Sequence, residues 1–297
     1  KLMEERNFPF AELKLLASPK SAGKKLKVCG KDYVVEEATL ESFEGIDIAL
    51  FAGGKISETL APEAVKRGAI VIDNSSTFRM DPHVPLVIPE INPEDIAKHQ
   101  GIIANPNCST IIMLMALKPI HDISPIKRII VSTYQAVSGA GKDGIDELFK
   151  ETEAVFTSKE YTPQILPSSG LPKHYQIAYN LIPQIDVFLE NQYTKEEMKM
   201  YNETRKIMHS DIKVSATCVR VPALRAHSES IWIETERPVS VEEAREAFAK
   251  GEGLVLQDNP AEKEYPMPLF LAGKDPVYVG RIRKDLTNDC GLTFWIV

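Results

Sequence analysis

Apolar and polar positions alternate in blocks along the first hundred residues, and this pattern predicts short strands separated by helices. Strand-length apolar runs occur at residues 12–18, 32–37, 46–52, 69–74, 85–89 and 102–104, and a helical pattern occurs at residues 57–67. Strands that alternate with helices at this spacing form βαβ units, so we expect a mostly parallel sheet. A ligand of such a sheet binds at the loops that follow the strand ends.

The pattern changes from about residue 114, where longer strand patterns dominate. Strands are predicted at residues 128–137, 213–222, 228–236, 278–284 and 291–297, and helices after residue 108, from residue 142 to 156, at 195–208 and at 241–250. Residues 157–186 form an irregular stretch with several prolines and serines. Long strands with fewer helices are typical of an α+β domain with an antiparallel or mixed sheet. We therefore predict an α/β protein with two domains, residues 1–107 and 108–297.

Composition and charge exclude several classes of protein. A formal net charge of −7 and a pI near 5.5 argue against a nucleic-acid surface, which requires a basic face. No apolar run approaches the roughly 20 residues of a membrane span, and no signal peptide is visible. The four cysteines lie far apart without a CxxC pair, which argues against a zinc site and a disulfide framework. We expect no metal and a reducing, cytoplasmic location.

Both ends of the sequence indicate that it is part of a longer chain. It opens at Lys1 in what reads as the tail of an amphipathic helix running to about Glu5, and it stops inside the strand pattern at residues 291–297. A domain does not normally begin or end within an element, so flanking segments are expected.

The stretch Asn105-Pro-Asn-Cys-Ser-Thr110 is the first candidate for chemistry. It follows a short apolar strand and opens an apolar helix, so Asn107 or Cys108 is expected to cap that helix. A thiol at a helix start faces unpaired N–H groups and the positive end of the helix dipole, and both favour the thiolate. Cys108 is therefore a candidate nucleophile, with a buried structural cysteine as the alternative.

A second candidate site is the run Arg220-Val-Pro-Ala-Leu-Arg-Ala-His-Ser-Glu229. Arg220 could bind a carboxylate or phosphate through its planar guanidinium group. His227 could exchange a proton with a thiolate because its ordinary pKa lies near neutral pH. The alternative is a pair of surface side chains without a catalytic role.

Three turns are candidates for phosphate binding. Ser138-Gly139 opens a helix and could form an anion cradle of backbone N–H groups, and Gly53-Gly54 follows a buried strand, where a backbone can approach a cofactor. The turn that contains Lys20 and Ser21 is basic and has no carboxylate, although an NAD-preferring site places an acidic residue near there. If this is a dinucleotide site, it suits NADP, and otherwise it is a solvated basic loop.

Together these motifs resemble the aspartate-semialdehyde dehydrogenase family. The resemblance runs from Phe8 to Val297, with four blocks in the family's order at residues 73–92, 105–110, 131–141 and 220–229. It implies a Rossmann-like NADP-binding domain at residues 1–107 and a catalytic and dimerisation domain at residues 108–297. Two parts of the family pattern are missing, the N-terminal strand with its Gly-rich turn and the C-terminal helix.

The resemblance implies a role for each matching residue. Cys108 is implied as the nucleophile, His227 as the general acid/base and Gln135 as the residue that orients the acyl intermediate. The implied substrate-binding residues are Arg79, Arg220, Glu196, Lys199 and Asn107, and the implied cofactor-binding residues are Lys20, Ser21, Gly53, Gly54, Ser75, Ser138 and Gly139. Glu196 and Lys199 share one helix face at a spacing of three, and from the residues alone they would be a solvated ion pair.

The implied reaction is the reversible, NADP-dependent reductive dephosphorylation of L-aspartyl 4-phosphate to L-aspartate 4-semialdehyde through a cysteine thioester. It belongs to the biosynthesis of lysine, threonine, methionine and diaminopimelate, and the implied assembly is a homodimer or homotetramer formed through the second domain.

Three alternatives stay open. N-acetyl-gamma-glutamyl-phosphate reductase and glyceraldehyde-phosphate dehydrogenase use a cysteine and a histidine on a similar plan. Their typical Gly-Cys-Tyr-Pro and Cys-Thr-Thr-Asn-Cys runs are absent here, and Glu196 suits a free substrate amine. A dinucleotide-binding redox sensor would leave Gln135, Arg220 and His227 without a function.

Overall fold

The computed structural model describes residues 2–297, which divide into two compact units. The first unit comprises the residues up to Pro85 together with Lys98–Asn105, and the second comprises Leu86–Ala97 and Pro106–Val297. Lys1 lies outside the described residues. The helix that the sequence predicts near the start of the chain is present as α1 (Leu2–Glu5).

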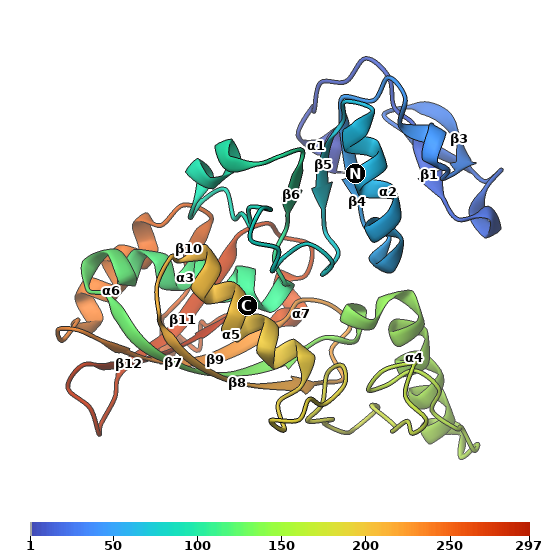
Figure 1. The fold of residues 1–297 in the computed structure, drawn as a ribbon. Coiled ribbons are helices and arrows are strands. Elements are labelled where there is room, and N and C mark those ends of the chain that lie inside the picture. Colours follow the sequence, from blue (N-terminus) through green and yellow to red (C-terminus); the bar gives the residue numbers. More distant parts are fainter. Residues whose placement is uncertain (1) are drawn as a thin grey trace. The chain divides into compact units, whose positions relative to one another are not determined.

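The first unit is built on a small parallel sheet (Figure 1). Its strands are β4 (Ile48–Phe51), β5 (Ile70–Asp73) and β6 (Ile102–Ala104), all parallel and in this order. Helix α2 (Ser57–Lys66), preceded by the 3-10 turn η3 (Gly54–Ile56), packs against the sheet. The shared core contains alanine, branched aliphatic and aromatic side chains, namely Phe43, Ala49, Phe51, Leu60, Ala61, Ala64, Ala69 and Val71.

A second three-stranded sheet precedes this core in the sequence. Strand β1 (Leu15–Ala17) runs parallel to β3 (Lys31–Glu37), and β2 (Lys25–Val28) pairs with β3 in the antiparallel direction. The 3-10 turns η1 (Pro19–Ser21) and η2 (Leu40–Phe43) follow β1 and β3. Strand β2 was not predicted, because two of its four residues are exposed lysines and its sequence reads as part of the basic turn.

One predicted strand of this region is wrong. Residues 85–89 carry buried Leu86, Val87 and Ile88 but form no strand, because prolines at both ends lack the N–H groups that a sheet needs. The buried Asn92 side chain binds this segment instead: it accepts a hydrogen bond from Ile88 N at 2.9 Å and donates one to Leu86 O at 2.9 Å.

The second unit is built on a mixed six-stranded sheet in the order β10-β11-β12-β9-β7-β8. Its strands are β7 (Ile126–Gln135), β8 (Lys213–Arg220), β9 (Ser228–Thr235), β10 (Leu254–Leu256), β11 (Val277–Lys284) and β12 (Gly291–Ile296). Strand β7 is parallel to β8 and antiparallel to β9, which confirms the predicted mixed sheet. The short strand β10 was not predicted.

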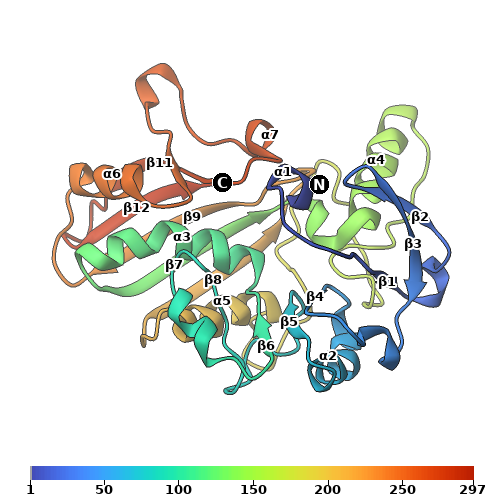
Figure 2. The ribbon, with the colours of Figure 1, turned by 90° about the horizontal axis from the view of Figure 1, so that it is seen from above.

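Three helices cover one face of this sheet, as Figure 2 shows. They are α3 (Cys108–Ile123), α5 (Lys195–Ile207) and α6 (Val241–Lys250), and each begins at a side-chain cap: Asn107, Thr194 or Ser240. Helix α3 is almost wholly buried through Met113, Leu114, Ala116, Leu117 and Ile120. The short helix α7 (Pro268–Leu271) and the 3-10 turn η6 (Pro260–Glu262) lie between β10 and β11 in the sequence.

Two buried carboxylates hold the irregular stretch that follows α4 (Gly141–Thr157). Glu147 accepts hydrogen bonds from the backbone N–H groups of residues 164–166, and Glu151 accepts from Ile177 N and Ala178 N at 2.8 Å each. The stretch thus stays ordered without regular structure, because its buried N–H groups find acceptors on α4. No helix of residues 2–297 is long and apolar enough to cross a membrane.

Candidate active site

The start of helix α3 positions Cys108. The Asn107 side chain accepts hydrogen bonds from Ser109 N at 3.0 Å and from Thr110 N at 3.2 Å, so Asn107 is the cap and Cys108 is the first helical residue. The Asn-Pro-Asn sequence favours this turn, because Pro106 cannot extend the preceding strand pairing and Asn107 supplies the acceptor. The Cys108 side chain is exposed to solvent.

Glu196 connects the residues around this turn. Its Oε1 accepts hydrogen bonds from Asn107 Nδ2 at 2.8 Å and from Gln135 Nε2 at 3.1 Å, and its Oε2 lies 3.0 Å from Lys199 Nζ. Burial opposes ionisation of Glu196, but the Lys199 ammonium and these two amide donors outweigh it and lower the pKa of Glu196. Two turns of α5 further on, Glu203 accepts a hydrogen bond from Asn107 N at 2.6 Å. A buried, ionised carboxylate therefore lies beside the Cys108 turn.

Gln135 and Arg220 end two neighbouring strands at the same level, since they are register partners in the β7–β8 pair. The Gln135 side chain is fixed at both ends, because its Oε1 also accepts a hydrogen bond from Thr133 Oγ1 at 3.0 Å. Arg220 is only 3 % exposed and donates from one terminal nitrogen to Ala136 O at 2.8 Å. Burial lowers the pKa of Arg220, but guanidinium groups stay charged in proteins, so a positive charge is held here.

His227 is fixed as one tautomer by the backbone. Its Nδ1 accepts a hydrogen bond from Ala136 N at 3.0 Å, so the neutral ring carries its proton on Nε2. Burial, followed by the charge of Arg220, lowers the pKa of His227 to about 4, and the ring is neutral at pH 7. The preceding Ala226 has a φ of 66°, a left-handed conformation that sets the direction of the chain as it enters β9.

Gly139 packs directly against this pair. A Cβ at Gly139 would lie 2.6 Å from Arg220 Nη1 and 3.5 Å from His227 Cε1, so only glycine leaves both side chains in place. The sequence predicts that backbone N–H groups of this turn form an anion cradle, and this prediction is wrong for the N–H groups of Ser138 and Gly139. Ser138 N donates to Leu224 O and Gly139 N donates to Ala136 O, because the turn η5 (Val137–Ala140) closes on itself and on the neighbouring loop.

The predicted low pKa of Cys108 is also wrong. The protein packed around the thiol and the charge of Glu196 raise the pKa of Cys108 to about 11, and these effects outweigh the backbone N–H of Ser109, which favours the thiolate. A helix start alone therefore does not activate this thiol. Activation must come from positive charge, and Arg220 provides one such charge within the same unit.

The first unit holds the remaining predicted residues. Arg79 is buried and donates from Nε to Asn105 O at 2.9 Å and from Nη2 to Asn74 O at 3.0 Å, so its guanidinium group braces the ends of β5 and β6. The buried Asp73 carboxylate accepts hydrogen bonds from Ser57 Oγ at 3.0 Å and from Ser75 Oγ at 2.6 Å. Ser75 is thereby held at the carboxyl end of the parallel sheet.

Lys20 and Ser21 lie in η1, directly after β1, as the sequence predicts. Lys20 is exposed, and Lys24 Nζ donates to Ser21 Oγ at 3.3 Å. Gly53 and Gly54 follow β4; a Cβ at Gly53 would collide with Ile56, and Gly54 has a φ of 60°, so the turn into η3 requires both glycines.

Two carboxyl groups were missed by reasoning from the sequence. Glu203 lies seven residues after Glu196 on α5, a spacing that places both on one helix face, and this period could have identified it. Glu229 lies two residues after His227 on β9, is fully buried, and has no hydrogen-bond partner for either oxygen among residues 2–297.

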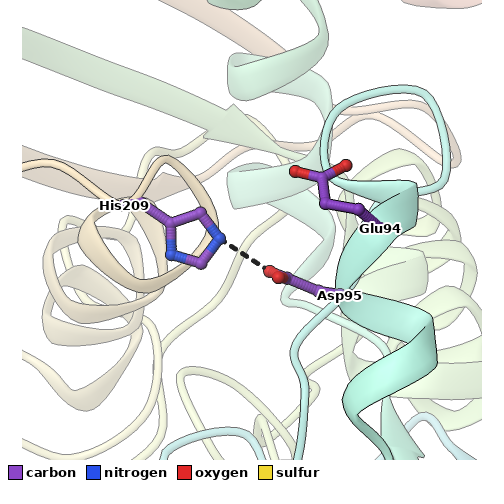
Figure 3. A group of neighbouring side chains, drawn as sticks. All are labelled: Glu94, Asp95 and His209. Atoms are coloured by element: carbon purple, nitrogen blue, oxygen red, sulfur yellow. Dashed lines mark hydrogen bonds and ion pairs between the residues drawn. The ribbon is translucent and has the colours of Figure 1, made fainter.

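A further polar cluster contains Glu94, Asp95 and His209 (Figure 3). Asp95 Oδ2 lies 2.8 Å from His209 Nε2 and accepts a hydrogen bond from Asn92 Nδ2 at 2.8 Å. These bonds attach the segment Leu86–Ala97 to the end of α5, which is a structural role.

Comparison with known proteins identifies relatives over the whole chain. Residues 1–99 match a family model described as semialdehyde dehydrogenase, NAD binding domain, and residues 117–297 match one described as semialdehyde dehydrogenase, dimerisation domain. The aspartate-semialdehyde dehydrogenase of Bacillus subtilis is 54% identical over 100% of this chain and 87% of the relative.

Solved structures agree with this match. The aspartate semialdehyde dehydrogenase II of Vibrio cholerae, described as complexed with ASA, is 44% identical with a TM-score of 0.93 over 99% of this chain and 86% of that chain. The enzyme of Candida albicans, described as solved with NADP, is 25% identical with a TM-score of 0.71 over 96% of this chain and 85% of that chain.

Proposed function

The chain belongs to the aspartate-semialdehyde dehydrogenase family, and from this we propose that it interconverts L-aspartyl 4-phosphate and L-aspartate 4-semialdehyde with NADP in the biosynthesis of the aspartate family of amino acids. One observation carries the assignment most directly. The Asn107 cap of the Cys108 helix, the amide of Gln135 and the ammonium of Lys199 all meet on the single buried carboxylate of Glu196. This arrangement supports a thiol nucleophile next to an anion that can hold a substrate amine.

The first step of the biosynthetic direction is acyl transfer to Cys108. The sulfur attacks the acyl carbon of aspartyl phosphate, the carbon–oxygen bond to phosphate breaks, and phosphate leaves with that electron pair. The Gln135 side chain is held between Thr133 and Glu196 and orients the resulting thioester. Because the pKa of Cys108 is raised, the positive charge of Arg220 must favour the thiolate when substrate is bound.

The second step reduces the thioester. The nicotinamide supplies a hydride to the acyl carbon when NADPH is bound. His227 carries its ring proton on Nε2, so the neutral ring can donate a hydrogen bond to the oxygen that becomes negatively charged. The oxyanion then re-forms the carbon–oxygen double bond as the carbon–sulfur bond breaks, which releases the aldehyde and returns the electron pair of that bond to sulfur.

Charge complementarity supports the proposed substrate. Within the second unit, Arg220 would bind the α-carboxylate, Glu196 the α-amino group and Lys199 the phosphate, with Asn107 lining the site. Arg79 of the first unit stays a proposed phosphate ligand. An N-acetylated substrate has no cationic amine, so the ionised Glu196 would find no counter-charge on it. This favours aspartyl phosphate over the N-acetylglutamyl alternative.

The first unit provides the chemistry that a dinucleotide phosphate needs. The glycine turn after β4 allows close backbone approach, Ser75 offers a hydroxyl, and the turn η1 offers Lys20 and Ser21 without a carboxylate. A basic turn suits a ribose 2′-phosphate, so we infer a preference for NADP over NAD. Ser138 and Gly139 remain proposed cofactor contacts. Residues 1–107 and 108–297 remain the two proposed functional domains.

The second unit also has a surface suited to self-association. On the face of its sheet opposite the helices, Ile130, Tyr134, Trp232 and Trp295 are only partly buried. The match to a dimerisation domain supports a homodimer formed there, alone or within a homotetramer. The four free cysteines agree with a reducing, cytoplasmic location.

The test is a spectrophotometric assay of purified protein with aspartate semialdehyde, phosphate and NADP. Phosphate-dependent NADPH formation is expected, with much lower kcat/KM for N-acetylglutamate semialdehyde and for NAD. Cys108→Ala should abolish turnover, whereas Cys29→Ala, at an exposed cysteine of the first unit, should leave it unchanged. Turnover that survives Cys108→Ala would refute the nucleophile assignment.

A further inference from the structure

Glu229 is a buried carboxyl group that the proposed reaction does not use. It lies on β9 with 0 % exposure, two residues after His227, and neither of its oxygens has a hydrogen-bond partner among the described residues. Buried polar side chains are nearly always hydrogen-bonded, and an unpaired carboxylate would be costly in this position. A group retained at such a cost next to a reaction centre calls for a physical role.

The sheet places Glu229 beneath the helix that carries the nucleophile. Strand β9 lies between β12 and β7, and α3 packs against both of these strands. The register partners of Glu229 are Thr133 on β7 and Ile296 on β12, which are both buried on the helix-covered face. On the helix side, the hydroxyl groups of Ser109 and Thr110 in the first turn of α3 are also buried without a hydrogen-bond partner in the described residues.

The groups that face Glu229 are two thiols and one carboxylate. Cys108 of α3, Glu196 of α5 and Cys218 of β8 all interact with it electrostatically. Burial, followed by the charge of Glu196, raises the pKa of Glu229 well above its ordinary value, so the surroundings of this group favour its protonated form. An ionised Glu229 would in turn raise the pKa of Cys108. Negative charges on Glu229 and on the Cys108 sulfur therefore disfavour each other.

We propose that Glu229 is a positioning residue for the nucleophile, a carboxylic acid that stays protonated beneath the Cys108 turn so that only the sulfur becomes negatively charged. The proposal rests on the proposed function of Cys108 as the nucleophile. Glu196 supplies the fixed negative charge for the substrate amine, and the un-ionised Glu229 adds no second charge against the thiolate. Loss of the Glu229 proton at alkaline pH would then suppress the thiolate.

The pH dependence of Cys108 alkylation tests this without any substrate. Wild type and Glu229→Gln are treated with iodoacetamide from pH 6 to pH 10, and the Cys108 peptide is quantified by mass spectrometry. Gln has the shape of the protonated acid, so the two rates should agree within about twofold at pH 7. Above pH 9 the variant should react several-fold faster, because it cannot acquire the opposing charge. Glu151→Gln, at a buried carboxyl of α4, should follow the wild type throughout.

Infrared spectroscopy provides a second measurement on the wild type itself. A C=O stretch of a protonated carboxylic acid is expected at pH 7, absent in Glu229→Gln, and shifted when Cys108 is alkylated. A merely structural carboxyl would not respond to the thiol. The shift on alkylation needs no Glu229 variant, so the proposal stays testable even if that variant does not fold.

Several results would overturn the proposal. Equal alkylation rates at every pH would show that the thiol does not sense Glu229, and a different rate at pH 7 would show that Glu229 is ionised or otherwise needed there. A carboxylic-acid band whose frequency does not change when Cys108 is alkylated would exclude an interaction between Glu229 and the thiol. Failure of the proposed function would appear separately, as absent semialdehyde turnover in the wild type.

Discussion

Asn107 caps the helix that carries Cys108 and also donates a hydrogen bond to Glu196, so its replacement can test both interactions. Asn107→Ala removes the acceptor for two N–H groups of α3 and the 2.8 Å donor to Glu196. Loss of an N-cap costs about 1 kcal/mol, and loss of a donor to a buried carboxylate costs about 1–3 kcal/mol. We therefore expect the free energy of unfolding, measured by urea denaturation, to fall by about 2–4 kcal/mol, the sum of these two ranges.

Asn107→Asp is the matched variant, because its carboxylate still caps the helix but can no longer donate to Glu196. Two carboxylates in contact cannot both ionise easily, so the pKa of the pair is raised in the folded state. The variant should be near wild-type stability below about pH 4 and lose stability as the pH rises through that raised pKa. Both variants should lose about 100-fold in kcat/KM, which corresponds to about 2.7 kcal/mol. Unchanged stability and kcat/KM in Asn107→Ala would refute the role of this cap.

Three further predictions follow from particular contacts. Gly139→Ala should lower kcat/KM at least tenfold with a nearly unchanged melting temperature, because its Cβ would lie 2.6 Å from Arg220 Nη1 and displace only the end of that side chain; wild-type kinetics would contradict the assigned position of Arg220. The pKa of His227 is lowered to about 4 in the folded protein, so on acidification the unfolded chain protonates this histidine at a higher pH than the folded protein does. The free energy of unfolding should therefore fall by up to about 3 kcal/mol between pH 6.5 and pH 4, and this fall should be smaller in His227→Gln. Ile130→Glu should shift the protein toward monomer in analytical ultracentrifugation, since it places a charge on the open sheet face, whereas Leu286→Glu at a fully solvated loop should not.

The regular elements were predictable where one face of an element is apolar and its ends carry clear signals. Helix α3 begins at Asn107 because the cap lies in the local sequence, and β7, β8 and β9 follow from long β-branched runs. The segment at residues 85–89 was misjudged because Pro85 O accepts a hydrogen bond from Ala104 N of β6, whereas Leu86 O and Ile88 N bond to the side chain of Asn92 rather than to a neighbouring strand.

The properties of the site depended on contacts between distant parts of the sequence. A local pattern gives Cys108 a helix start, but burial by distant parts of the chain, followed by the charge of Glu196 on α5, reverses the expected direction of its pKa. The tautomer of His227 depends on Ala136 N, and the need for glycine at position 139 depends on Arg220. Residue identity could suggest these groups, whereas their burial and pairing required the fold.

The most direct test of the central claim is to trap the acyl enzyme at Cys108. The protein is incubated with aspartate semialdehyde and NADP in the absence of phosphate, and its peptides are analysed by mass spectrometry. One aspartyl group is expected on the Cys108 peptide, with discharge when phosphate is added and no adduct in Cys108→Ser. Phosphate-dependent turnover without any adduct at Cys108, or an adduct that forms on another residue and is discharged by phosphate, would contradict the thioester mechanism.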